Sequence, residues 1–490
     1  MVFATVYAPP MKIAIRIVIG LALAVAALLL VLYIALAPPA PLGVPEPGAV
    51  LSGVTVINPG HGREANRLVR VEGETIASIA SADGTTGEYS GAFVLPGLID
   101  MHAHFPPPSA LGNTEHFAFL FLYHGVTTVR HAGDLDGTTT EPARQGVRSG
   151  AFPGPRVFAC GPFVDGDGSR WPNSRQVREP AEAREVIEAI AEDYDCVKAY
   201  NTLTPESAAA VHAAAKEVGI PVIGHVPRGA RFDDAHLDDA QHLMGMTGPE
   251  GSHGPFPQSM SAWRDLDDER LDEIVRSAVA RGIAVTPTLV VIDRLSRMHD
   301  HAALSLEFDA QLMPRYFRDV VWRQNPELTD ADYVGLRAAL ARELELIAAL
   351  HRAGVRIHAG TDVLVSFVVP GASMHRELQL FVDAGLTPEQ AWEIATRSNG
   401  SFLPTPGLGT VTPGAPADLL VFSEDPTHDL AALDSLLAVV ANGRLYTRTE
   451  LDAHLALRRS HIEGAIFDRV SVEIARRVMA RLFDRSKEED

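Results

Sequence analysis

The chain has 490 residues, 46% of them hydrophobic and 21% charged, and a formal net charge of -20. This length suits one large barrel with a smaller satellite domain, and the composition supplies enough apolar material for a packed core. The acidic balance and the lack of any basic tract argue against nucleic acid or an anionic lipid surface as the working partner. These numbers are also compatible with a homo-oligomer.

The chain has two cysteines, Cys160 and Cys196. Two are too few for a disulfide scaffold or a thiolate zinc site. We place each on one of two neighbouring strands, where they are able to pair. Two unpaired thiols in the core are nevertheless the expected state.

The N-terminus holds a long apolar segment. Lys12 and Arg16 precede an uncharged run over residues 17–37, which is long enough to span a bilayer as an α-helix. A secretory signal would look similar, but Pro38 directly follows the candidate cleavage site Ala35-Leu36-Ala37, and this disfavours cleavage. We therefore expect an uncleaved transmembrane anchor.

Positive charge lies before this apolar run, so residues 1–16 are expected in the cytoplasm and the rest of the chain in the periplasm or outside the cell. Residues 38–48 are rich in proline and indicate a stiff linker. Alternating runs over 49–95 and 405–448 predict strands of one small β-sandwich domain, built from both flanks of a larger domain over 96–404. Residues 449–490 predict a charged helical tail.

Strand-like and helix-like segments alternate within 96–404, which indicates βαβ units and a parallel sheet. Eight candidate strands lie at 98–104, 126–131, 156–161, 196–200, 220–226, 239–243, 284–290 and 356–362. Eight is the number that a closed (β/α)8 TIM barrel requires. The Gly/Pro/Ser-rich segments 162–178 and 248–263 follow the third and sixth strands, where either active-site loops or plain surface loops are expected.

Polar residues suited to metal binding cluster at the ends of these strands. His102 and His104 lie two apart on the first strand and so face the same way, into the barrel mouth. The other strand ends contribute Lys198, His225, His242 and Asp362. A lone strand histidine is more often a satisfied core residue, but core packing explains six suitable residues on five strands poorly. Active sites of TIM barrels lie at this mouth.

The chain resembles the amidohydrolase superfamily, in particular its imidazolonepropionase-like and prolidase-like binuclear metal hydrolases. The matching stretches are VLPGLIDMHAH (94–104), GVTTVR (125–130), VKAYN (197–201), GHVP (224–227), AGTD (359–362) and GAPADL (414–419). Resemblance extends from about residue 50 to about residue 450, and its ordered motifs are highly specific. The anchor and the C-terminal tail lie outside it.

The resemblance implies a role for each residue of this set. One divalent metal ion, zinc by analogy, would be held by His102, His104 and Asp362, and a second by His225 and His242. Lys198, carboxylated by carbon dioxide, would bridge the two. A hydroxide shared by the metals would attack a carbonyl polarised by the second metal. Asp362 would take its proton and pass it to the leaving group.

Three further residues are candidates for contact with the substrate. His131 stands where relatives often carry an acidic residue, and either touches substrate or satisfies the strand end. Tyr200 and Arg228 are candidates for holding a substrate oxygen or carboxylate. The alternative for each is a side chain that only packs in the structure or is exposed to solvent.

Three alternatives compete with an amidohydrolase. A mononuclear deaminase would typically carry a glutamate where this chain has Arg228, and would leave Lys198 without a role. A non-catalytic binding barrel would usually have lost a ligand, and none is missing. A lactonase or esterase would use the same binuclear site. We expect hydrolysis of a C–N bond in a small substrate such as a dipeptide or an N-acyl amino acid.

Overall fold

The computed structural model describes residues 11–107, 113–169, 171–248, 262–323 and 328–485. Its centre is a parallel sheet of strands β5 (Leu98–Ala103), β6 (Val126–His131), β7 (Arg156–Asp165), β9 (Cys196–Ala199), β10 (Val222–Gly224), β11 (Asp239–Gln241) and β12 (Ala284–Thr286), with β8 (Arg175–Gln176) paired to β7. Each strand pairs in parallel with the next. This sheet belongs to a TIM barrel.

Residues 356–362 close the ring between β12 and β5. On one side the His358 amide donates to the carbonyl of Val285 at 2.8 Å, and on the other the Met101 amide donates to Ala359 at 2.9 Å. The predicted seventh strand, 284–290, is too long. Pro287 cannot continue the strand ladder, and α8 begins at Leu289.

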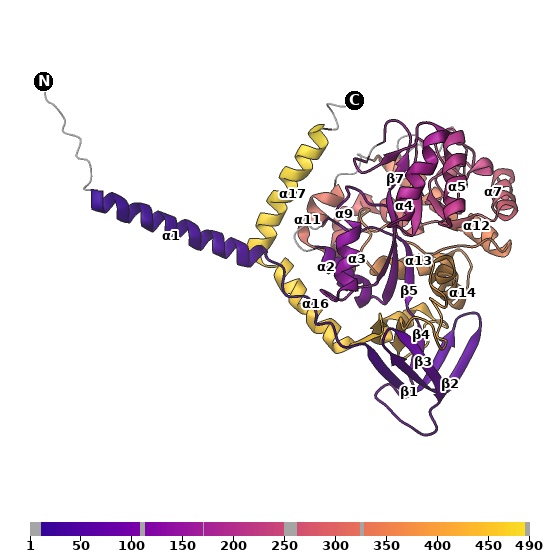
Figure 1. The fold of residues 1–490 in the computed structure, drawn as a ribbon, viewed down its shortest axis with the longest axis horizontal. Helices are drawn as coiled ribbons and strands as arrows, with labels where there is room; N and C mark the ends of the chain where they lie inside the picture. Colours follow the sequence, from indigo (N-terminus) through magenta and orange to yellow (C-terminus); the bar gives the residue numbers. More distant parts are fainter. Residues whose placement is uncertain (1–10, 108–112, 170, 249–261, 324–327, 486–490) are drawn as a thin grey trace.

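Helices cover the outside of the barrel (Figure 1). The longer ones are α2 (Asn113–Tyr123), α3 (Thr140–Arg148), α4 (Ala183–Ala191), α5 (Pro205–Val218), α7 (Asp268–Arg281), α8 (Leu289–Ser296), α12 (Asp330–Arg352) and α13 (Ala372–Asp383). Shorter ones are α9 (His301–Leu306), α10 (Phe308–Gln311), α11 (Arg315–Asp319), α14 (Pro388–Glu393) and α15 (Asn399–Phe402). Their apolar faces and the outward residues of the strands form one large buried core.

A second sheet lies at one end of the molecule (Figure 1). It combines β1 (Gly48–Asn58), β2 (Gly62–Glu72), β3 (Thr75–Ser81) and β4 (Phe93–Pro96) with β13 (Leu419–Phe422), β14 (Leu436–Ala441) and β15 (Arg444–Thr447). The two chain segments meet where β13 pairs with β4, with Leu420 opposite Leu95. The sheet has its own apolar core, and β4 runs directly into the first barrel strand.

Both ends of the chain are helical. Helix α1 (Met11–Leu36) projects away from the rest of the chain (Figure 1), and its segment Ile15–Leu36 is long and apolar enough to cross a membrane. A signal sequence passes the same test. After the second sheet the chain continues as α16 (Arg448–Ile462) and α17 (Ala465–Arg485).

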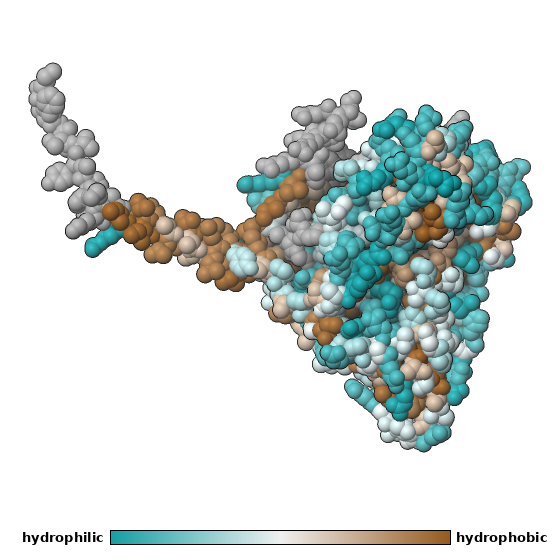
Figure 2. All heavy atoms as spheres, in the orientation of Figure 1, coloured by the Kyte–Doolittle hydropathy of each residue, from teal (hydrophilic) through white to brown (hydrophobic). Residues whose placement is uncertain are grey.

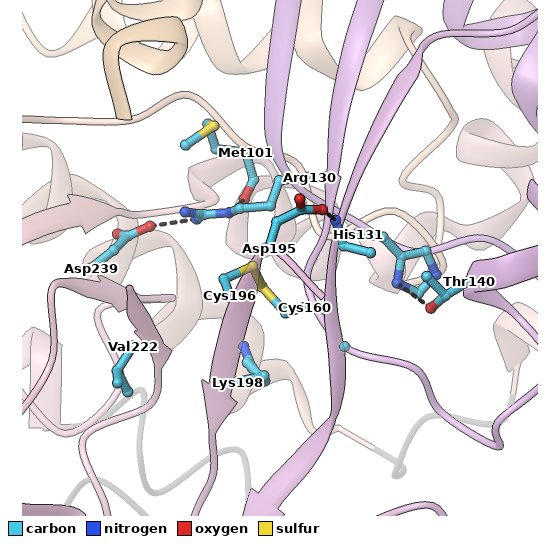
Figure 3. Close-up of a disulfide and its surroundings, with 12 residues drawn as sticks. Met101, Arg130, His131, Thr140, Cys160, Asp195, Cys196, Lys198, Val222 and Asp239 are labelled. Atoms are coloured by element: carbon cyan, nitrogen blue, oxygen red, sulfur yellow. Dashed lines mark hydrogen bonds and ion pairs between the residues drawn. A yellow bond between two sulfur atoms is a disulfide. The ribbon is translucent and has the colours of Figure 1, made fainter. Parts of the chain in front are cut away.

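The two cysteines form a disulfide inside the barrel (Figure 3). The expectation of two unpaired thiols is wrong, because β7 pairs with β9 in a register that sets Cys160 directly opposite Cys196. Their Cα atoms are 4.5 Å apart, within the usual range for a disulfide. Both side chains point into the barrel with Ala132 and Ile223, one layer below Lys198.

Candidate functional site

The six residues that the sequence predicts as metal ligands converge at the mouth of the barrel. His104, Lys198, His225, His242 and Asp362 line a cavity of about 370 Å³. His102 lies beside it, and its ring centroid is 4.3 Å from that of His242. The strands place these groups at their carboxyl ends, where the barrel opens.

Three of these residues surround a single point. His102 Nε2 lies 3.3 Å from His104 Nε2 and 3.3 Å from Asp362 Oδ1, and His104 Nε2 lies 3.4 Å from the same oxygen. Ligand atoms arranged tetrahedrally at about 2.0–2.1 Å from one ion are about 3.3 Å apart. The triangle therefore fits a divalent metal ion. His102, His242 and Asp362 also form a group able to hold a metal.

The other side of the cavity holds a second set of donors. The ring centroids of His225 and His242 are 5.1 Å apart, and His242 Nδ1 lies 3.7 Å from Asp362 Oδ2. Lys198 is 1% exposed and donates from Nζ to Gln241 Oε1 at 2.5 Å. Asp362 thus faces both sets of donors and connects the two halves of the site.

Backbone and side-chain oxygens orient the histidine rings. His104 Nδ1 lies 3.0 Å from the Gly133 carbonyl, which can only accept, so Nδ1 carries the proton. His225 Nδ1 lies 2.7 Å from Asn201 Oδ1 in the same way. In both rings the Nε2 lone pair is left free for a ligand in the cavity. Such partners fix the tautomer of a metal-binding histidine.

Electrostatics favour metal ligation. Burial holds the pKa of His102 and His225 well below its usual range, and burial lowers the pKa of His242 to about 4, so these rings are neutral donors. Burial opposes the charged form of Asp362, but His242 and His102 nevertheless hold its pKa well below the usual value. Burial also lowers the pKa of Lys198 to about 7.

The backbone is strained at this site. His242 and Asp362 have φ values of 59° and 57°, in the left-handed region, which costs a residue other than glycine about 1–3 kcal/mol. Asp362 is held there by its amide, which donates to the His102 carbonyl at 2.7 Å. Asp100 fixes the same two strands, since it accepts from the amides of His102 and Thr361. Strain that surrounding contacts maintain is typical of functional sites.

The structure separates the three candidate substrate residues. Tyr200 lines the cavity. His131 does not line it: it is buried behind His104, where Nε2 accepts from the Phe105 amide at 3.1 Å, so the histidine satisfies the strand end. Arg228 is exposed outside the cavity, because the chain turns after Pro227.

Sequence reasoning missed most of the cavity wall, which is apolar. Its side chains include Leu135, Phe163, Trp171, Ile292, Leu364 and Val365. Phe163 stacks on Trp171 with centroids 5.5 Å apart and meets Tyr200 edge-on at 4.9 Å. Trp171 lies in segment 162–178, so the position of this loop after the third strand was the available signal. Most of segment 248–263 lies outside the described residues.

A barrel of seven parallel strands closed by segment 356–362, with clustered imidazoles and a carboxylate at its mouth, is typical of metal-dependent hydrolases. The model of the amidohydrolase family matches residues 93–446. The chain belongs to the amidohydrolase family. It is thus a hydrolase acting on carbon–nitrogen bonds, in a family that generally binds divalent metals.

Solved structures share the fold. Bottromycin amidohydrolase is 24% identical with a TM-score of 0.69, covering 88% of this chain and 92% of its own. A Xaa-Pro dipeptidase with bound methionine is 20% identical (TM-score 0.59; 82% and 100% covered). Ochratoxinase of A. niger is 17% identical (TM-score 0.58; 82% and 96% covered). A dihydroorotase of Bacillus licheniformis is 43% identical over 51 residues, which is 10% of this chain and 12% of that relative's length.

Proposed function

We propose that the chain hydrolyses an amide or peptide-like bond of a small substrate at two divalent metal ions, with zinc as the proposed metal. His102, His104 and Asp362 would hold one ion, and His225 and His242 the other. The observation that carries the proposal is the triangle of two Nε2 atoms and one carboxylate oxygen with edges of 3.3–3.4 Å. When bound, such ions supply a nucleophilic water of lowered pKa and polarise the scissile carbonyl.

Asp362 is the proposed catalytic residue. One carboxylate oxygen faces His102 and His104 and the other faces His242, so the side chain lies between both donor sets. Its lowered pKa keeps it ionised. In that state it can accept a proton from the attacking water and transfer the proton to the leaving nitrogen.

Lys198 is the proposed bridging ligand, as a carbamate. Its uncharged amine would add to carbon dioxide, forming one N–C bond as one C=O π bond opens and releasing one proton, to give a carbamate whose single negative charge is shared by two oxygens. Burial supports this step because it lowers the pKa of Lys198 to about 7, so a large share of the amine is uncharged at neutral pH. Gln241 Oε1 holds the nitrogen in place.

The cavity favours a substrate with an apolar group beside the scissile bond. Phe163, Trp171 and Tyr200 form a continuous aromatic wall, and a wall of this kind binds apolar or aromatic side chains. Two structural relatives, a Xaa-Pro dipeptidase and an amidohydrolase, support a peptide-like substrate by their names. We therefore infer a dipeptide or an N-acyl amino acid that carries an apolar side chain.

We propose that α1 is an uncleaved membrane anchor and that the catalytic domain faces the periplasm or the cell exterior. Two observations support this location. Helix α1 is apolar over a membrane-spanning length, with Lys12 and Arg16 at its start. The Cys160–Cys196 disulfide is a bond that persists in oxidising compartments and is rare in the cytosol.

Metal content tests the site directly. The full chain, purified without chelators and with bicarbonate present, would be analysed by plasma mass spectrometry beside His102→Asn. His116→Asn is the matched control, because His116 is also buried but lies on α2, where it contacts the Leu312 carbonyl. We expect two ions per chain in the parent and the control, and a sharp loss in His102→Asn. Equal metal content in all three would contradict the assignment.

Lysine 198 and the substrate need separate measurements. Lys198→Ala should lower both metal content and activity, and full retention of both would rule out the bridging role. A screen of dipeptides, N-acyl amino acids and lactones then identifies the type of bond that the enzyme hydrolyses. Turnover of lactones alone would replace the amide assignment with a lactonase or esterase on the same site.

A further inference from the structure

Helix α17 carries an exposed apolar stripe. Ile466, Val470, Ile474 and Val478 recur every four residues and so lie along one side of the helix. Ile466, Ile474 and Val478 are 42%, 41% and 48% exposed. Single exposed apolar residues are normal on a soluble protein, but a row of them on one helix indicates a contact surface.

The stripe is not the face that packs on the catalytic domain. That neighbouring face carries Phe467 and Val472, which are buried, with Ala475 and Met479 packed against the core. An ion pair between Arg315 and Asp468, 2.8 Å between Nε and Oδ1, also ties α17 to α11. Helix α17 is therefore fixed to the domain while its apolar stripe stays uncovered.

The apolar anchor ends beside this stripe. Helix α1 contacts α17, and Leu36 at the end of α1 packs against the same core as Ala475 and Met479. Figure 1 shows that α17 runs steeply across the direction of α1. In Figure 2 the apolar surface of α1 continues onto the base of α17. A helix that crosses the end of a membrane-spanning helix lies close to the plane of the membrane surface.

We propose that α17 lies in the interface of the bilayer that α1 spans, with Ile466, Ile474 and Val478 at the boundary of the acyl chains. The proposal rests on the proposed anchoring by α1 and is independent of the chemistry of the active site. Helices that lie on a membrane combine an apolar side with basic residues on the polar side. Exposed Arg469 and Arg476 provide those residues on α17, whereas Arg477 lies beside the stripe and is paired with Glu473 at 2.8 Å.

Attachment by the stripe needs no attraction between the whole protein and anionic lipid. The net charge of -20 opposes such attraction, but α1 already holds the chain at the membrane, so the apolar stripe only has to insert locally. Fixing α17 in the interface would give the catalytic domain one orientation on the membrane, because α17 packs on the domain over several turns.

Depth-dependent quenching in the full chain tests the position of α17. Its natural cysteines are both in the buried disulfide, so one introduced cysteine takes a polarity-sensitive fluorophore. We would label Ile474→Cys and Val478→Cys in phosphatidylcholine nanodiscs that contain lipid with a shallow nitroxide. A label at Tyr33→Cys in α1 tests whether that helix lies in the bilayer. Val279→Cys is the matched control, since Val279 is 53% exposed on α7, away from α17 (Figure 1).

We expect emission at shorter wavelength and loss of most fluorescence for labels at 474, 478 and 33, and neither effect at 279. Unquenched labels at 474 and 478 with a quenched label at 33 would overturn the interfacial position and leave the anchor intact. An unquenched label at 33 would overturn the anchor and the interfacial helix together. Metal content and hydrolysis decide the proposed enzymatic function separately.

Discussion

Two polar layers lie one above the other inside the barrel. The upper layer, at the mouth, holds His102, His104, Lys198, His225, His242 and Asp362. The lower layer holds Arg130, Asp239, Thr286 and His358, all of them 0–1% exposed. Both layers contain imidazole, carboxylate and a cationic side chain, so residue type alone does not distinguish them.

The lower layer is built around a buried ion pair between Arg130 and Asp239. Arg130 donates to Asp239 and, at 2.7 Å, to the Met101 carbonyl (Figure 3). Asp239 also accepts from Thr286 Oγ1 at 2.8 Å and lies 3.3 Å from His358 Nδ1. The ring of Phe402 packs on both Arg130 and His358. Among the described residues His358 Nε2 and Arg130 Nη1 have no hydrogen-bond partner, but no residue of this layer lines the cavity at the barrel mouth, so we interpret the layer as structural.

The upper layer differs in where its lone pairs point. His358 and Asp362 lie on the same closing segment with inward-facing positions, yet Asp362 is 19% exposed while His358 is 0% exposed. In the upper layer the Nε2 atoms of His102 and His104 both face the same oxygen, Asp362 Oδ1. Ligand atoms that converge on one point beside a cavity, more than residue identity, distinguish the upper layer as the candidate metal site.

The largest expected effect comes from Asp362→Asn in the upper layer. The substitution removes the carboxylate proposed as a metal ligand and proton acceptor, so we expect turnover to fall by about 10²–10⁴-fold. The midpoint of thermal unfolding should scarcely change, because the site contains strained backbone and lone pairs that face the cavity, and neither stabilises the fold. Asp238→Asn is the control, since Asp238 faces outward to His212. A comparable loss of turnover in the control would contradict the role of Asp362.

Asp239→Asn in the lower layer should give the opposite result. It leaves Arg130 as an uncompensated buried charge, and breaking such a pair costs about 3–5 kcal/mol of unfolding free energy. Denaturant titration measures this loss. The double variant Arg130→Met, Asp239→Asn removes the stranded charge as well and should regain part of the stability. A single variant as stable as the parent would show that the pair is dispensable.

The sequence predicts the barrel and the convergence of six polar residues at its mouth, because both follow from strand alternation. His102 lies on β5 and His104 directly follows it, Lys198 lies on β9, and His225 and His242 directly follow β10 and β11, so their convergence needs only the fold. Contacts set by strand register or loop path were out of reach. The disulfide depends on the register between β7 and β9. The burial of His131 and the exposure of Arg228 depend on local turns, and the Phe163–Trp171 stack depends on the path of a loop.

Removing the disulfide should give the smallest of the three effects. It also tests the difference between the two layers, because Cys160 and Cys196 lie one layer below Lys198. Both partners are at most 2% exposed, and the bond closes a loop with a sequence separation of 36. A cross-link over this separation stabilises a fold by about 3–4 kcal/mol. We expect Cys160→Ala, Cys196→Ala to lose an amount of that order in denaturant titration and to keep full metal content. Lost metal at unchanged stability would instead assign the disulfide to the upper layer, as a positioning element for Lys198.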